Sequence, residues 1–225
     1  MSKNAGRSIL ALAFASFLIA GLTISPSTAA QFNSQATASQ VLAQIPVKGR
    51  APKTGYSRAQ FGQAWADTNH NGCDTRNDIL KRDLTFVTFR PGTHDCVVLT
   101  GILHDPYSGA VINFVRGVAT SPLVQIDHIV SLSNAWQTGA FKLSLETRTL
   151  MANDPLELLA VKGSLNTQKS DGDAATWLPP LKSYRCAFVA RQVAVKAKYG
   201  LWMTKAEKEA IAKILTSCPK QPIPN

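Results

Sequence analysis

The adjacent residues Asp127 and His128 are the part of this sequence best suited to chemistry, because they combine an acid with a potential general base. They lie in an apolar run, residues 124–132, and a second apolar run follows at residues 156–161. Asn166 comes shortly after the second run. A neutral imidazole can take a proton from water, while carboxylate and amide oxygens suit a hard cation such as Mg²⁺. The pattern therefore predicts two strands and a helix that hold one divalent cation, a site able to hydrolyse phosphodiester bonds.

The surrounding pattern predicts the elements that must position these residues. Short β-rich runs separated by turn residues predict a small antiparallel sheet from residues 84–89, 96–102 and 111–116. Helices are predicted at residues 57–66, 74–83, 144–152, 183–199 and 204–216. The last of them opens on a capping box, Thr204 with Glu207. The expected fold class is therefore α+β, with a strand–strand–helix core, the small sheet and flanking helices.

The N-terminus is typical of a secretory signal peptide. Lys3 and Arg7 precede the apolar residues 9–22, and a run of small residues ends at Ala30. An uncleaved anchor is the alternative, but this apolar stretch is shorter than the ~20 residues that span a bilayer, and no later segment is long enough. The chain is thus expected to divide into a signal peptide at 1–30, a flexible lead-in at 31–54, one domain at 55–218 and a tail at 219–225.

The four cysteines are expected to form two disulfide bonds, because export places them in an oxidising compartment. No Cys-x-x-Cys pair indicates zinc or redox chemistry. Three pairings are open. The pairing of Cys73 with Cys96 and of Cys186 with Cys218 is preferred, because each bond then closes a local loop.

The formal net charge of +10 indicates a polyanionic partner, whether nucleic acid, anionic membrane or acidic cell-wall polymer. Many basic residues together fit a surface that follows phosphates with little sequence specificity. They are Lys81, Arg82, Arg116, Arg185, Arg191, Lys196, Lys198, Lys205, Lys208 and Lys213.

Several separated segments, in order, point to one family. They are Tyr56-Ser57-Arg58 with Phe61 and Trp65, Asn71 to Asp78, Asp105 to Gly109, Asp127 to Val130 with Ala135-Trp136, and Asn166 to Lys169 with Ala174 to Pro180. With these motifs the sequence resembles the HNH endonucleases of the ββα-metal class. It resembles more closely their secreted bacterial branch related to the C-terminal domain of GmrSD-type restriction enzymes, the DUF1524 family. The resemblance implies a secreted endonuclease for DNA, with RNA as the alternative, that uses one Mg²⁺ or Mn²⁺ ion; a monomer is expected.

Carried onto this chain, the family pattern makes His128 the general base and Asp127 and Asn166 the metal ligands. It places Lys169 near the phosphate, in a catalytic and substrate-binding role. It also implies that Arg76 faces the substrate cleft.

The sequence departs from the family pattern at Glu157, where the family usually has an asparagine that orients the catalytic histidine. Either Glu157 takes over that role, or the nearby Asn153 does, or catalysis is weakened. This departure keeps a second hypothesis open. The protein could be a catalytically silent, cationic binding module for extracellular nucleic acid or acidic cell-wall polymer.

Residues 67–78 form a second candidate metal site. Asp67, Asn69 and Asn71 stand at positions 1, 3 and 5 of an EF-hand calcium loop, with Gly72 at position 6 and Asp78 at position 12. Aspartate at position 12 reaches less far than the usual glutamate. An ordinary Asn-Gly turn is the alternative to a Ca²⁺ site.

Overall fold

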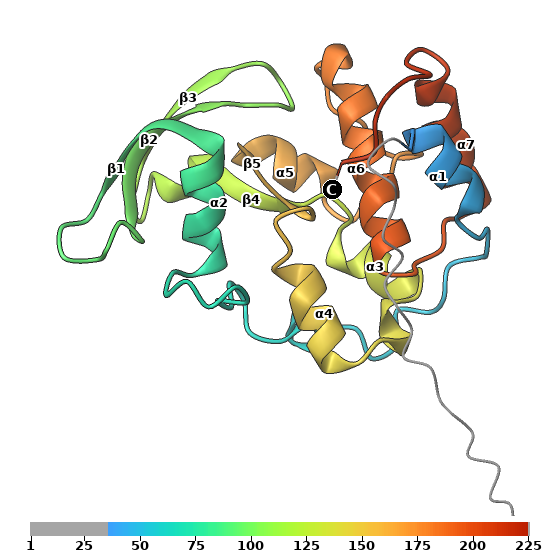
Figure 1. Ribbon diagram of the computed structural model, residues 1–225, viewed down its shortest axis with the longest axis horizontal. Helices are drawn as coiled ribbons and strands as arrows, with labels where there is room; N and C mark the ends of the chain where they lie inside the picture. The colour runs from blue at the N-terminus through green and yellow to red at the C-terminus, as the bar shows by residue number, and fades with distance from the viewer. Residues whose placement is uncertain (1–35, 225) are drawn as a thin grey trace, which may run out of the picture.

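The structure, a computed structural model, describes residues 36–224 and contains two antiparallel sheets and seven α-helices in that range. The three-stranded sheet lies at one side, helices α1, α6 and α7 lie at the other, and strands β4 and β5 run between them (Figure 1). The strands are β1 (Leu84–Phe89), β2 (Val98–His104), β3 (Val111–Val115), β4 (Val124–His128) and β5 (Leu158–Lys162). The helices are α1 (Ala38–Gln44), α2 (Thr75–Asp83), α3 (Leu132–Gln137), α4 (Leu145–Ala152), α5 (Gly163–Lys169), α6 (Arg185–Lys198) and α7 (Lys205–Leu215). The predicted α+β class is confirmed.

The three-stranded sheet has the order β1-β2-β3, and both of its strand pairs are antiparallel. Its buried side chains, including Leu103 and Phe114, pack with residues of α2, β4 and β5. The turn between β2 and β3 is tied to β5, because the Asp105 carboxylate accepts a hydrogen bond from the backbone N–H of Lys162 at 2.9 Å. Tyr107, in the same turn, thereby reaches the end of β4.

Strands β4 and β5 and helix α5 form the expected ββα unit. His128, the last residue of β4, lies opposite Leu158 of β5 in an antiparallel pair. Helix α5 begins directly after β5 and packs on both strands. Its first residue is Gly163, and a Cβ there would lie 2.0 Å from the carbonyl oxygen of Pro122. Only glycine permits this close approach, which brings Lys169 to the end of β4.

Helix α6 forms the centre of the helical side, where its Phe188 and Val193 pack with residues of α1 and α7. Helix α7 opens on the predicted capping box of Thr204 and Glu207. The Glu207 carboxylate also forms a buried ion pair with Lys196 of α6, at 2.6 Å. Packing and this ion pair together hold α7 against α6.

Both predicted disulfide bonds are confirmed. Cys73–Cys96 joins the segment just before α2 to the loop before β2. Cys186–Cys218 joins the first turn of α6 to the segment after α7. The bonds span sequence separations of 23 and 32 residues. By the chain-entropy argument, cross-links of this size each stabilise a fold by roughly 3 kcal/mol.

Residues 36–44 of the expected flexible lead-in and residues 219–224 of the expected tail are instead packed on the core. Residues 38–44 form helix α1, which opens on a capping box of Thr37 and Gln40. Its Val41 and Leu42 are buried in the core beside α6 and α7. The tail pairs with the segment before α1, and Ile223 is buried there. These apolar residues are too few to form a recognisable periodic pattern in the sequence, yet each packs against the core.

The predicted helix at 57–66 is wrong beyond Phe61, because only residues 58–61 form a single 3-10 turn, η1. Gly62 ends it with a φ of +75°, and a Cβ there would lie 2.1 Å from the Thr149 hydroxyl. Trp65 also has a positive φ, +59°. Residues 56–65, which we call the strap, therefore cross α4 as an irregular segment.

The predicted signal peptide lies outside the described residues. Within residues 36–224, no helix has the length and apolar character needed to cross a membrane.

If α1 is part of the core, Leu42→Ala should lower the free energy of unfolding by about 2–5 kcal/mol, because it leaves a cavity in a packed interior. Urea unfolding followed by circular dichroism measures this. Leu145→Ala is the matched control, since that leucine is 55% exposed; it should change stability by no more than about 0.5 kcal/mol. Equal small effects of both variants would contradict the packing of α1.

Candidate functional site

The structure brings Asp127, His128 and Asn166 together at a polar cleft, as the sequence predicts. The cleft has a volume of about 210 Å³, enough for several water-sized groups. Its polar lining comes from the strap, from the end of β4 and from α5 and the residues after it. These side chains are Tyr56, Arg58, Asp127, His128, Ser131, Asn166, Ser170 and Asp171.

His128 is held as a neutral imidazole. Its Nε2 lies 3.0 Å from the carbonyl oxygen of Ala152, and because a carbonyl only accepts, Nε2 carries the proton. Burial, and then the charge of Arg58, lower the pKa of His128 to about 3. Trp65 stacks on the ring, with centroids 6.2 Å apart. Nδ1 is therefore unprotonated at neutral pH, and it forms no hydrogen bond to any residue in the described range.

Asp127 is buried and paired on both carboxylate oxygens. Lys169 Nζ donates to Oδ1 at 2.9 Å, and the Tyr107 hydroxyl donates to Oδ2. The same Nζ donates to the carbonyl oxygen of His128 at 2.7 Å. The Lys169 side chain has no exposed surface. It serves as the internal counter-ion of Asp127, and its predicted contact with a substrate phosphate stays a prediction.

Asn166 is held by Gln125 of β4, whose side-chain oxygen accepts from Asn166 Nδ2 at 2.9 Å. This contact leaves the amide oxygen of Asn166 without a hydrogen bond to the described part of the chain. Each oxygen of Asp127 retains one lone pair beyond its present hydrogen bond. These donors fit a hard cation. Across residues 36–224, no group of three or more His, Cys, Asp or Glu is arranged to hold a metal, so water and phosphate would supply most ligands.

Among the described residues, neither Glu157 nor Asn153 forms a hydrogen bond with His128, and the Ala152 carbonyl binds its Nε2 instead. Glu157 is completely buried, and its Oε2 accepts from the backbone N–H of Val130 at 3.0 Å. Burial raises the pKa of the Glu157 carboxyl well above its usual value. Asn153 Nδ2 donates to the Thr149 carbonyl at 2.9 Å. Glu157 thus braces the backbone that follows His128, and Asn153 caps α4.

Arg76 and Arg116 lie at the other end of β4 from His128. Arg76 donates to the carbonyl oxygen of Val124, the first residue of the strand, at 3.3 Å. Arg116 donates to Asn77 and to the backbone of β2. Four residues of strand separate Val124 from His128, about 13 Å. Neither arginine lines the cleft in this structure, and the predicted substrate contact of Arg76 stays a prediction.

The candidate calcium loop is closed by hydrogen bonds within itself. The Asp67 carboxylate accepts from the backbone N–H groups of Asn71 and Gly72, at 3.1 and 2.8 Å. Asn71 Nδ2 donates to Asp78 at 3.0 Å, and Asn69 also accepts from the Asn71 amide. The Ca²⁺ site stays a prediction.

Sequence reasoning assigned no role to Tyr56, Arg58, Trp65 or Tyr107, although each lies in a segment that carries the family resemblance. Trp65 and Arg58 line a second, small pocket that His128 also lines, together with Phe61. Tyr107 binds Asp127. The only sequence signal for them was their place in those segments, because all four reach the site from outside the ββα unit.

The buried ion pair predicts a large stability effect for Lys169→Met, a loss of about 3–5 kcal/mol, because Asp127 is left as an unpaired buried charge. Urea unfolding at pH 7 measures it. The double variant Lys169→Met with Asp127→Asn should recover part of that loss. A double variant less stable than the single one would contradict the charge argument.

Glu157→Gln should become more stable relative to the unsubstituted protein as the pH rises. The folded protein binds a proton at Glu157 that the unfolded chain releases above pH ~4.5, so this group weakens folding with rising pH. Unfolding free energies measured between pH 4 and 8 check the slope. A constant difference between the two proteins would contradict a protonated Glu157.

The comparisons with known proteins agree with this geometry. The family described as GmrSD restriction endonucleases, C-terminal domain, matches residues 74–214, a range that contains Asp127, His128 and Asn166. A protein of Arthroderma benhamiae described as an uncharacterized secreted protein is 37% identical over 187 residues, 82% of this chain and 86% of that protein. No solved structure matches the chain. Because the match covers more than half of the chain, the protein belongs to the family of the C-terminal domain of GmrSD restriction endonucleases.

Proposed function

We propose that this protein is a secreted, metal-dependent HNH-type endonuclease that hydrolyses phosphodiester bonds of DNA, with RNA as the alternative substrate. The observation that carries the proposal is the state of His128. Its imidazole is neutral, its Nε2 is fixed by the Ala152 carbonyl, its Nδ1 has no hydrogen bond to any described residue, and the residue lines the polar cleft. A fixed imidazole with one free lone pair is the arrangement a general base requires.

Each residue of the cleft has a separate role in the proposed hydrolysis. Nδ1 of His128 takes a proton from a water molecule, whose oxygen forms a bond to phosphorus as the bond from phosphorus to the 3′ oxygen breaks. The 3′ oxygen then takes a proton from solvent, so the products carry a 5′ phosphate and a 3′ hydroxyl. The stacked Trp65 and the Ala152 carbonyl prevent the imidazole from turning away from the attacking water.

Asp127 and the amide oxygen of Asn166 would hold one Mg²⁺ ion, for which Mn²⁺ can substitute. When bound, the cation neutralises charge on the phosphate and on the leaving oxygen. The ion pair of Lys169 with Asp127 holds this carboxylate in place.

Substrate class and location follow from charge and from the family. A net charge of +10 favours a polyanion, and the family is that of a restriction-endonuclease domain. The signal-peptide pattern at residues 1–30, the two disulfide bonds and the description of the A. benhamiae relative as secreted support export.

One observation favours the second candidate, a catalytically silent binding module for extracellular nucleic acid or acidic cell-wall polymer. Asp127 is already neutralised by Lys169 and bound by Tyr107, which weakens its attraction for a cation. Such a module would bind DNA or wall polymer in a salt-dependent manner without chelator-sensitive cleavage.

Purified protein with its disulfide bonds intact should convert supercoiled plasmid to nicked and linear forms in Mg²⁺ or Mn²⁺, and a chelator should stop the reaction. His128→Ala should lower the rate by about 100-fold or more, because the general base is lost. Gel densitometry of time courses measures both effects.

His104→Ala is the matched control, since His104 is exposed at the end of β2 and lies outside the cleft lining. It should cleave at the unsubstituted rate. Cleavage by His128→Ala at that same rate would overturn the assignment of the base, and retention on DNA without any cleavage would favour the binding module.

A further inference from the structure

The strap contributes to the site although it lies outside residues 74–214, the range of the family match. Tyr56 and Arg58 line the polar cleft that also contains His128. Arg58 also lines the small pocket that contains His128, Phe61 and Trp65. The strap therefore contributes Arg58 to both pockets that the proposed general base lines.

The backbone that carries Arg58 is firmly held. Arg148 of α4 donates to the carbonyl oxygen of Gln60 at 2.5 Å. Phe61 is 2% exposed and contacts Trp136, with ring centroids 6.4 Å apart. Gly62 packs so closely on α4 that no side chain would fit there. A residue next to such anchors is presented to the cleft without a large ordering cost.

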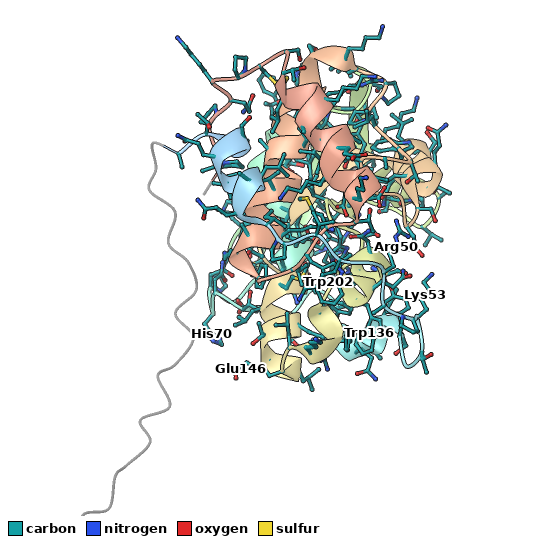
Figure 2. The ribbon with its side chains drawn as sticks, turned by 90° about the vertical axis from the view of Figure 1, so that its right-hand side faces the viewer. Arg50, Lys53, His70, Trp136, Glu146 and Trp202 are labelled. Carbon is teal, nitrogen blue, oxygen red and sulfur yellow. A yellow bond between two sulfur atoms is a disulfide. The ribbon has the colours of Figure 1, made fainter. Side chains whose placement is uncertain are left out.

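Arg58 is the cation at the cleft that has no acidic partner among the described residues. Asp127 is paired with Lys169, and Asp171 is paired with Lys53 at 2.7 Å. Figure 2 places Lys53 at an edge of the molecule, near Arg50. Arg58 is exposed, and among residues 36–224 its guanidinium has neither an ion-pair partner nor a hydrogen bond. It is the only Lys or Arg in the lining of the cleft, which thus carries one uncompensated positive charge.

We propose that Arg58 binds the scissile phosphate and is the substrate-contacting cation of this site. The planar guanidinium offers paired N–H donors that match two phosphate oxygens. Lys169, which the family pattern suggested for this contact, is completely buried. The proposal rests on the endonuclease function proposed above.

The test compares Arg58→Gln, Arg58→Lys and Arg90→Gln in the full protein. Arg90 is the matched control, because it is exposed, directly follows strand β1 and lies outside the cleft lining. We expect Arg58→Gln to lose about 100-fold or more in kcat/KM, as expected when a charge-stabilising donor is removed. Arg58→Lys should recover part of that loss, and Arg90→Gln should match the unsubstituted protein. All four proteins should unfold at the same urea midpoint.

Binding gives a second readout that is independent of cleavage. In the His128→Ala background, Arg58→Gln should reduce the slope of log affinity against log salt for a short DNA duplex by about 0.9, the value for one lost phosphate contact. If the unsubstituted protein cleaves plasmid while Arg58→Gln keeps its rate, the phosphate contact is overturned and the proposed function stands. If Arg58→Gln lowers the salt slope but not the cleavage rate, the contact with the scissile phosphate is likewise overturned and the proposed function stands. If the unsubstituted protein fails to cleave plasmid whether Mg²⁺ or Mn²⁺ is supplied or withheld, both proposals fail.

Discussion

The buried ion pair between Lys169 and Asp127 is the interaction on which the site depends. Two charges in an interior lose hydration, and they are tolerated only when further hydrogen bonds satisfy them. Tyr107 and the carbonyl oxygen of His128 supply those bonds. As a result, β4, the last turn of α5 and the turn between β2 and β3 meet at one point. The backbone of His128 is positioned from three directions.

Around this ion pair, the protein removes charge from the groups that it buries. His128 is neutral because burial and Arg58 oppose its protonation, and burial likewise favours the protonated form of Glu157. The acids that face the cleft have lysine partners. What remains at the cleft is a neutral imidazole beside one guanidinium, an electrostatic arrangement suited to an anionic ester.

The site also depends on chain segments that lie far from it in sequence. The strap is anchored to α4, and α4 in turn ends at Ala152, whose carbonyl fixes the imidazole. One short helix therefore links the position of Arg58 to the tautomer of His128. Helix α1 and the C-terminal segment close the opposite side of the core around α6. The family match begins at residue 74, so the strap and α1 lie outside the matched range.

The sequence by itself determined the elements with strong local signals and the residues that act through their chemical type. Local patterns in the sequence predicted the capping box at Thr204 and the short β-rich runs. The same is true of Asp127, His128 and Asn166, which lie within one ββα unit. The preferred cysteine pairs, each closing a local loop, also formed.

Only the tertiary structure decided the partners of these residues. Lys169 has the type and spacing of a phosphate ligand, yet burial against Asp127 gives it a different role. The sequence predicted Arg58 and Trp65 to lie in an ordinary helix. In the structure the helical turn ends at Gly62, which packs against Thr149, and the strap lines a pocket with His128. The physical reason is that burial and ion pairing arise between segments distant along the chain. A local pattern records which side chain is present, whereas the packing of remote segments determines the charge it meets.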